Sequence, residues 1–168
     1  LDGTGGTILL AAGTFYMKAV TVAGGFPWLS SGYKGGITIK GAGWQKTKIS
    51  QIDNQLFIMD AHAATAGAQT SGSRYDFSDF RVAGPGKTVV GSRTFDYSGQ
   101  GNWQNSLSWC SLDRIVVHDV ETVVYAVDVT GLYVNHTWFH DYKYGVNSGY
   151  NFPRSRRRAG ANGRANKT

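Results

Sequence analysis

Short runs in which apolar and polar residues alternate recur along most of the chain. Residues 37–40 (ITIK) alternate Ile with Thr and Lys, and residues 75–82 (YDFSDFRV) alternate Phe with Asp, Ser and Arg. A period of two places the apolar side chains on one face of a β-strand. We expect further strands at 7–17, 48–50, 56–61, 111–120, 122–131 and 132–142, with loops at 61–74 and 98–106. The chain is therefore predicted to be all-β, because its Ala-rich segment 60–69 is too short for a stable helix.

The apolar pattern returns after fixed shifts along the chain. The pairs His118–Asp119 and His140–Asp141 are 22 residues apart, and each follows a strand-like run. A shift of 22 residues, and one of 35 residues for an earlier run, brings apolar positions onto apolar positions. The superimposed pairs are Phe139 on Val117, Tyr142 on Val120, Val146 on Val124, Phe80 on Ile115 and Val82 on Val117, with Thr137 on Ile115 as the polar exception. Such a repeat predicts a parallel β-solenoid whose stacked coils share one core.

A sandwich of β-hairpins is the alternative fold. It requires two-residue turns such as Asp-Gly or Asn-Gly between consecutive strands. The chain has Asp-Gly at 2–3 and Asn-Gly at 162–163, and neither dipeptide lies between two predicted strands. Two Gly-x-Gly stretches, GAG at 41–43 and GPG at 84–86, suit solenoid turns better. The second is no phosphate-binding loop, because Arg81 stands where that motif requires Gly.

Charge divides the chain into two parts. The net charge is +6, yet residues 151–168 hold six basic residues and no acidic one, so the other 150 residues are balanced at eleven of each sign. We therefore expect a neutral β-domain at 1–150 and a basic tail at 151–168. Such a tail is commonly disordered, and it is the one part expected to contact nucleic acid. A globally basic body that coats nucleic acid is therefore not implied.

Few features of the sequence identify a compartment. A single cysteine, Cys110, excludes an internal disulfide, and no apolar run reaches the roughly 18 residues that a transmembrane helix needs. The chain begins at Leu1 in the middle of a strand-like pattern, without a secretory leader. We expect it to be a fragment of a longer protein or a processed product.

Two stretches near the beginning carry a resemblance to a known family. Residues 5–17 (GGTILLAAGTFYM) and 36–49 (GITIKGAGWQKTKI) resemble the first coils of the pectate-lyase-like right-handed β-helix proteins, and 112–120 and 132–146 resemble later coils. The family contains pectate lyases, polygalacturonase-like hydrolases and phage tailspikes. The resemblance covers roughly 3–147 and implies a right-handed, single-stranded parallel β-helix of about five to six coils. It also implies a location outside the cell or on a virion surface.

Alternation predicts which side chains leave the core. With Phe80, Ile115 and Phe139 inward, the outer face has three rows: Asp79–Arg114–His136, Arg81–Val116–Trp138 and Ala83–His118–His140. An exposed indole beside cations, imidazoles and an acid suits a polysaccharide groove. The substrate-binding candidates are Asp79, Arg81, His118, His136, Trp138 and His140. The alternative is ordinary surface, with Asp79 and Arg114 as a cross-strand pair and Trp138 covered by a loop or a neighbouring subunit.

Asp119 and Asp141 are the candidates for acid chemistry. One coil apart, they are expected at about 4.8 Å, close to the ~5–5.5 Å of a retaining glycosidase pair. Two such carboxylates raise one pKa or share a cation, and Ca²⁺ is the cation that suits oxygen ligands. The resemblance to lyases implies a basic residue that removes the proton next to a uronate carboxylate, for which Arg114 and Arg81 are the candidates, provided that the charge of the arginine is strongly perturbed. Alternatively, both aspartates only cap turns, which is the commoner role of Asp at a strand end.

Two functions from different classes follow from these residues. The first is cleavage of an acidic or capsular polysaccharide, as a lyase or a glycoside hydrolase. The second is a non-catalytic tailspike or adhesin segment that uses the same sheet for glycan binding or subunit packing. A homotrimer would favour the second function. The fold alone does not choose between them, because it carries both.

Overall fold

The computed structural model describes residues 6–17, 36–51, 59–60, 74–97, 107–126 and 129–147, and within these ranges the protein is all-β. No helix occurs in the described part of the chain. Its strands are β1 (Gly6–Leu9), β2 (Gly13–Met17), β3 (Ile37–Lys40), β4 (Thr47–Gln51), β5 (Met59–Asp60), β6 (Tyr75–Ala83), β7 (Arg93–Tyr97), β8 (Leu107–Ala126), β9 (Val129–Asn135) and β10 (Trp138–Asn147). The predicted tail at 151–168 and nearly all of the predicted loops at 61–74 and 98–106 lie outside the described ranges.

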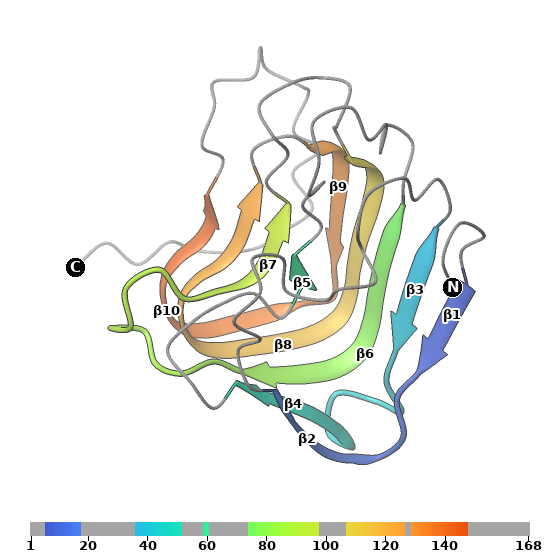
Figure 1. Ribbon diagram of the computed structural model, residues 1–168, viewed down its shortest axis with the longest axis horizontal. Coiled ribbons are helices and arrows are strands. Elements are labelled where there is room, and N and C mark those ends of the chain that lie inside the picture. The colour runs from blue at the N-terminus through green and yellow to red at the C-terminus, as the bar shows by residue number, and fades with distance from the viewer. Residues whose placement is uncertain are drawn as a thin grey trace.

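All strand pairs are parallel, and together they form one curled sheet. β8 lies at its centre and pairs with β6, β7, β9 and β10, while β6 pairs in turn with β3 and β4. Figure 1 shows the long strands β6, β8 and β10 nested inside one another and curving into a half-barrel. Because each strand pairs in parallel with a later pass of the chain, the hairpin sandwich considered from the sequence is wrong.

The register is the one that the sequence shifts predict. Along β8 and β10, Val117 pairs with Phe139, Val120 with Tyr142 and Val124 with Val146. Along β6 and β8, Phe80 pairs with Ile115 and Val82 with Val117. The predicted register at these pairs is confirmed, and it keeps Phe80, Val82, Ile115 and Val117 together on the inner side of the curl.

The core lies inside the curl. Phe80, Val82, Ile115 and Val117 are fully buried, as expected from their alternation with polar neighbours. Aromatic rings from different strands meet there, and Phe77 stacks on Phe95 with 5.4 Å between the ring centroids. The core therefore fixes which side of β6, β8 and β10 faces outward.

Two sharp corners bend the long strands, and each uses residues with positive φ. At the first corner these are Asp79, Arg114 and His136, with φ of 62°, 51° and 48°. At the second they are Asp119 and Asp141, with φ of 56° and 51°. This left-handed conformation is uncommon outside Gly, so its recurrence on neighbouring strands marks a repeated turn.

A Gly-x-Gly stretch lies against each corner. A Cβ on Gly41 would stand 2.2 Å from the carbonyl oxygen of Asp79, and one on Gly84 would stand 2.3 Å from that of Asp119. The second Gly of each stretch, Gly43 or Gly86, donates its backbone N–H to the same carbonyl at 2.9 and 2.7 Å. Both stretches are therefore turns, as expected, and only Gly fits at positions 41 and 84.

Candidate functional site

The segment between the two corners presents one outward face, which we call the Trp–His face. It consists of the outward side chains of β6, β8 and β10: Arg81, Val116, Trp138, His118 and His140. Two cross-strand rows build it, Arg81–Val116–Trp138 and Ala83–His118–His140, as the sequence predicted. Lys48 of β4 extends the first row, because it pairs with Arg81.

Aromatic rings form a continuous strip on this face. The imidazoles of His118 and His140 are stacked, with ring centroids 4.9 Å apart and planes within 5° of each other. Trp138 lies 5.1 Å from His140 in a tilted arrangement, and its side chain is 62% exposed. The indole is therefore open to a ligand in the structure described here, and no described loop covers it.

Each histidine of the strip is bonded to the aspartate that follows it. His118 Nδ1 lies 2.8 Å from Asp119 Oδ2, and His140 Nδ1 lies 2.9 Å from Asp141 Oδ2. A carboxylate can only accept, so Nδ1 carries a proton and Nε2 is left free to accept a proton or bind a ligand. The two carboxylates are thus engaged with their own imidazoles.

The electrostatics of Asp141 differ from those expected of a shared pair. Its hydrogen bond to His140 is the largest of the influences that lower the pKa of Asp141, and the nearby charge of Lys87 acts in the same direction. A carboxylate that shared a proton with a neighbouring carboxylate would have a raised pKa. Asp141 is therefore held ionised, with its side chain 59% exposed.

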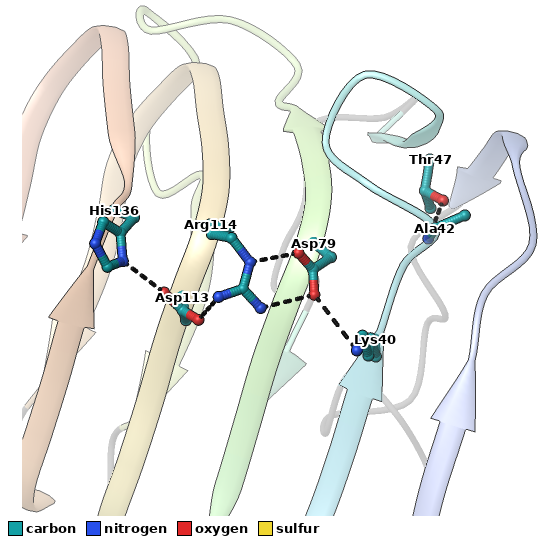
Figure 2. Close-up of polar contacts among 7 residues, drawn as sticks. All are labelled: Lys40, Ala42, Thr47, Asp79, Asp113, Arg114 and His136. Atoms are coloured by element: carbon teal, nitrogen blue, oxygen red, sulfur yellow. Dashed lines mark hydrogen bonds and ion pairs between the residues drawn. The ribbon is translucent and has the colours of Figure 1, made fainter.

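The first corner carries a network of ion pairs across neighbouring strands (Figure 2). Arg114 binds Asp79 through two contacts, Nε to Oδ1 at 2.6 Å and Nη2 to Oδ2 at 3.0 Å. Lys40 Nζ lies 3.9 Å from Asp79 Oδ2. Arg114 also contacts Asp113, which His136 Nδ1 reaches at 3.1 Å. This network links the strands β3, β6 and β8 and the end of β9.

The ion pairs hold both central groups in their charged forms. The hydrogen bond from Arg114 lowers the pKa of Asp79, whose side chain is only 16% exposed. The same contact raises the pKa of Arg114. A residue that removes a proton needs a lowered pKa, so the direction observed for Arg114 is opposite to that required by its predicted role as the base.

Position also separates this network from the Trp–His face. Simple alternation placed Asp79, Arg114 and His136 on the same flat face as Trp138 and His140. That placement is wrong, because positive φ at all three residues puts them on the corner itself. Strict alternation breaks there: Tyr75, Phe77 and Phe80 are all buried, which an unbroken period of two forbids.

Beyond the first corner lies a groove that the sequence did not reveal. It is open and has a volume of about 520 Å³; its lining residues are Arg74, Trp109, Ser111, Asp113, Tyr133, Asn135 and His136. His136 is the one predicted site residue among them. Trp109 and Tyr133 were missed because they stand on different cross-strand rows, Trp109 opposite Gly131 and Tyr133 opposite Ser111.

The metal prediction receives no support from clustered ligands. Within the described ranges, no group of three or more His, Cys, Asp and Glu side chains is arranged to hold a metal ion. Ca²⁺ also takes backbone carbonyl oxygens and water as ligands, so binding at Asp119 and Asp141 stays a prediction. None of the described segments is a helix of the length and apolarity that crossing a bilayer requires.

Comparison with known proteins does not assign the chain to a family. No family model, no curated protein and no solved structure matches it. The resemblance to pectate-lyase-like proteins therefore stays a prediction. Any function has to be argued from the faces and corners described above.

Proposed function

We propose that the protein is a right-handed parallel β-helix that binds an acidic polysaccharide on its Trp–His face, outside the cell or on a virion surface. Parallel pairing of successive passes, with sequence shifts of 35 and 22 residues between paired strands, supports this fold. Each pass contributes one strand layer to a common core, as a solenoid coil does.

Exposed Trp138 beside unpaired cations is the observation that carries the binding proposal. The indole offers a flat apolar plate for the face of a sugar ring. Arg81 lies two strands away in the same row, about 10 Å by strand spacing, and Lys48 lies one strand further. No ion pair to Arg81 or Lys48 occurs within the described ranges, so no acidic group described there competes with an anionic ligand for either charge.

The environment of Arg81 strengthens this assignment. Its Nε atom is buried and has no hydrogen-bond partner within the described part of the chain. A buried donor without a partner is costly, and a carboxylate that reached it would recover the lost hydrogen bond. The charge and geometry of the row therefore favour a polymer with carboxylate groups over a neutral one.

Binding of polygalacturonate, measured by isothermal titration calorimetry, tests this function. Fully methyl-esterified polygalacturonate is the matched control ligand, because it has the same rings without the charges. Trp138→Ala and Arg81→Gln are each expected to weaken binding of the acidic polymer about tenfold, which corresponds to the loss of one good contact. Tyr16→Ala removes another exposed aromatic side chain, 70% exposed on β2, and should change nothing.

Equal affinity for the charged and the esterified polymer would overturn the role of Arg81 and Lys48. Absence of binding to polygalacturonate, alginate and hyaluronate alike would overturn the function. Sedimentation of the protein in the same buffer gives its oligomeric state, and a trimer would support the tailspike or adhesin form of the proposal.

Cleavage of the bound polymer is the second candidate, supported by the two oriented His–Asp pairs. An imidazole whose Nδ1 is held by a carboxylate presents Nε2 as a base of the kind that removes a proton next to a uronate carboxylate. The carboxyl groups of Asp119 and Asp141 would then orient the histidines or, by holding Ca²⁺, help to neutralise the uronate.

Product analysis separates cleavage from binding alone. A lyase yields an unsaturated, ultraviolet-absorbing product, and a hydrolase releases reducing ends without it. For a lyase, Asp141→Asn should abolish product formation while binding persists, and a chelator should do the same if Ca²⁺ takes part. Binding without any product would leave the adhesin function.

A further inference from the structure

The groove beyond the first corner contains a tryptophan in an unusual backbone conformation. Trp109 has φ of 60°, in the left-handed region that a bulky residue seldom occupies. Such conformations persist where the surrounding structure enforces them, and they are concentrated at binding and catalytic sites. The residues that surround the indole of Trp109 therefore indicate whether this conformation serves a binding site.

Gly131 on the neighbouring strand makes room for the indole. It lies on β9 opposite Trp109 of β8, between the pairs Ser108–Thr130 and Cys110–Leu132. A Cβ at position 131 would stand only 3.2 Å from Trp109 Cε3. The ring is thus seated closely over a glycine, yet 58% of Trp109 stays exposed. The indole is positioned by the sheet and presented to solvent.

Tyr133 extends this aromatic surface. Its ring stacks on Trp109 with 6.1 Å between centroids and 16° between planes, and the residue is 49% exposed. Two positioned, exposed rings in a groove of about 520 Å³ have the size and character of a small-molecule site. Stacked rings of this kind suit the apolar face of a pyranose.

The charged groups that line the groove already satisfy one another. Arg74 Nε binds Asp76 at 2.6 Å, and Asp113 is bound by Arg114 and His136. Uncharged polar groups remain for a ligand. The amide of Asn135 makes no hydrogen bond within the described ranges, and Ser111 uses its hydroxyl proton on Asp76 but keeps acceptor capacity.

From these contacts we infer a second saccharide site, in which Trp109 and Tyr133 stack on an uncharged sugar ring while Asn135 and Ser111 bind its hydroxyl groups. The site differs from the Trp–His face in ligand and in position. There, unpaired cations favour a uronate; here, the ionic groups are neutralised and favour a sugar without charge. Because the two sites use different residues and different ligands, each can be tested independently of the other.

Calorimetric titration with four neutral hexasaccharides (cello-, malto-, manno- and xylohexaose) tests this site. Trp109→Gly removes the indole while glycine adopts the same positive φ without strain, so the variant is expected to fold. We expect it to weaken binding of the recognised hexasaccharide at least tenfold, and Tyr133→Ser to weaken it several-fold. Tyr16→Ser, in a more exposed aromatic residue outside the groove, should leave the affinity within twofold.

A double comparison keeps this site distinguishable from the proposed function. Trp109→Gly should retain polygalacturonate binding, and Trp138→Ala should lose polygalacturonate while keeping the hexasaccharide. Failure of all four hexasaccharides to bind the wild type, or unchanged affinity in Trp109→Gly with a wild-type melting temperature, would overturn the second site. Absence of polygalacturonate binding by the wild type, with hexasaccharide binding intact, would overturn only the function of the Trp–His face.

Discussion

The two corners of the sheet share a backbone design and differ in their side chains. At the first corner, Asp79 is nearly buried and joined to Arg114 by two contacts, within a network that reaches Lys40 and Asp113. At the second corner, Asp119 and Asp141 are more than half exposed, and each bonds the histidine before it. The described ion pairs of the aspartates cross between strands at the first corner and stay within one strand at the second, where the stacked imidazoles of His118 and His140 provide the cross-strand contact.

This difference shows that a corner's conformation does not require its side chains. In both corners the carbonyl oxygen of an aspartate, at 79 or 119, accepts a hydrogen bond from the second Gly of a Gly-x-Gly stretch. The carboxylates are left for other interactions. At the first corner they connect strands, and at the second they orient imidazoles beside the exposed indole of Trp138.

The largest expected loss of stability comes from adding a side chain at the glycine that lies against each corner. Gly84→Ala would drive a methyl group into the carbonyl of Asp119, and Gly41→Ala would do the same at Asp79. We expect each to lower the free energy of unfolding by about 3 kcal/mol or more, as overpacking against backbone does. Urea denaturation measures this loss.

Gly36→Ala is the matched control for these variants. A Cβ there would stand 3.6 Å from the nearest atom, an ordinary van der Waals contact, so little change is expected. A large loss at one corner glycine and none at the other would show that the corners do not share one backbone design.

The second largest effect is expected from removing one carboxylate at each corner, which should lower the melting temperature at the first corner but not at the second. Asp79→Asn removes the charge that holds Arg114, while Asn still tolerates positive φ. We expect the melting temperature to fall by about 2–4 °C. Asp119→Asn, at an exposed position without a cross-strand partner, should leave it unchanged. Equal losses of melting temperature in the two variants would show that the cross-strand ion pairs of Asp79 add nothing to stability.

Acid should reduce the contribution of the first corner. Because Arg114 lowers the pKa of Asp79 in the folded state, the stabilisation is complete above the unfolded-state pKa near 4 and is lost as pH falls through the folded-state pKa. The difference in melting temperature between wild type and Asp79→Asn should therefore be constant from pH 7 to about 5 and narrow below about pH 4. A difference that grew in acid would contradict this assignment.

The smallest effect is expected in the reactivity of Cys110. Burial raises the pKa of this thiol to about 12, so alkylation at pH 8 should proceed only when β8 opens. Asp79→Asn should accelerate alkylation a few-fold, because it weakens the link between β6 and β8. Asp119→Asn should leave the rate at the wild-type value, and an equal acceleration in both variants would count against the comparison.

The register could be predicted from the sequence, whereas the corners could not. Alternation and the shifts of 22 and 35 residues identify which residues pair, because slipping by one would expose Phe80 or Ile115. A corner breaks alternation for a single residue, and although Asp and His are enriched at positive φ, most residues of these types have negative φ, and Arg carries no such signal. The network at the first corner was therefore assigned to the wrong surface.

The Trp–His face and the Trp109–Tyr133 groove also differ in how well the sequence predicts them. The rows of the Trp–His face follow from the register, so Arg81, Trp138, His118 and His140 were placed correctly. Val116 was placed outward as well, yet it is only 6% exposed between its row neighbours, because packing on the outer side is invisible to alternation. The Trp109–Tyr133 groove depends on positive φ at Trp109 and on the glycine opposite, which only three-dimensional geometry reveals.

The role of the corner carbonyl has a consequence for how such a protein can change over time. Since the corner hydrogen bond uses a main-chain carbonyl that all residue types possess, positions 79 and 119 can exchange side chains among the residue types that tolerate positive φ, with Asp79 further constrained by its ion pair to Arg114. A surface of this kind can acquire a new ligand by point mutation while its architecture is inherited unchanged. The glycines at 41 and 84 have no such freedom. We therefore expect these two positions to be the most strongly conserved among homologues.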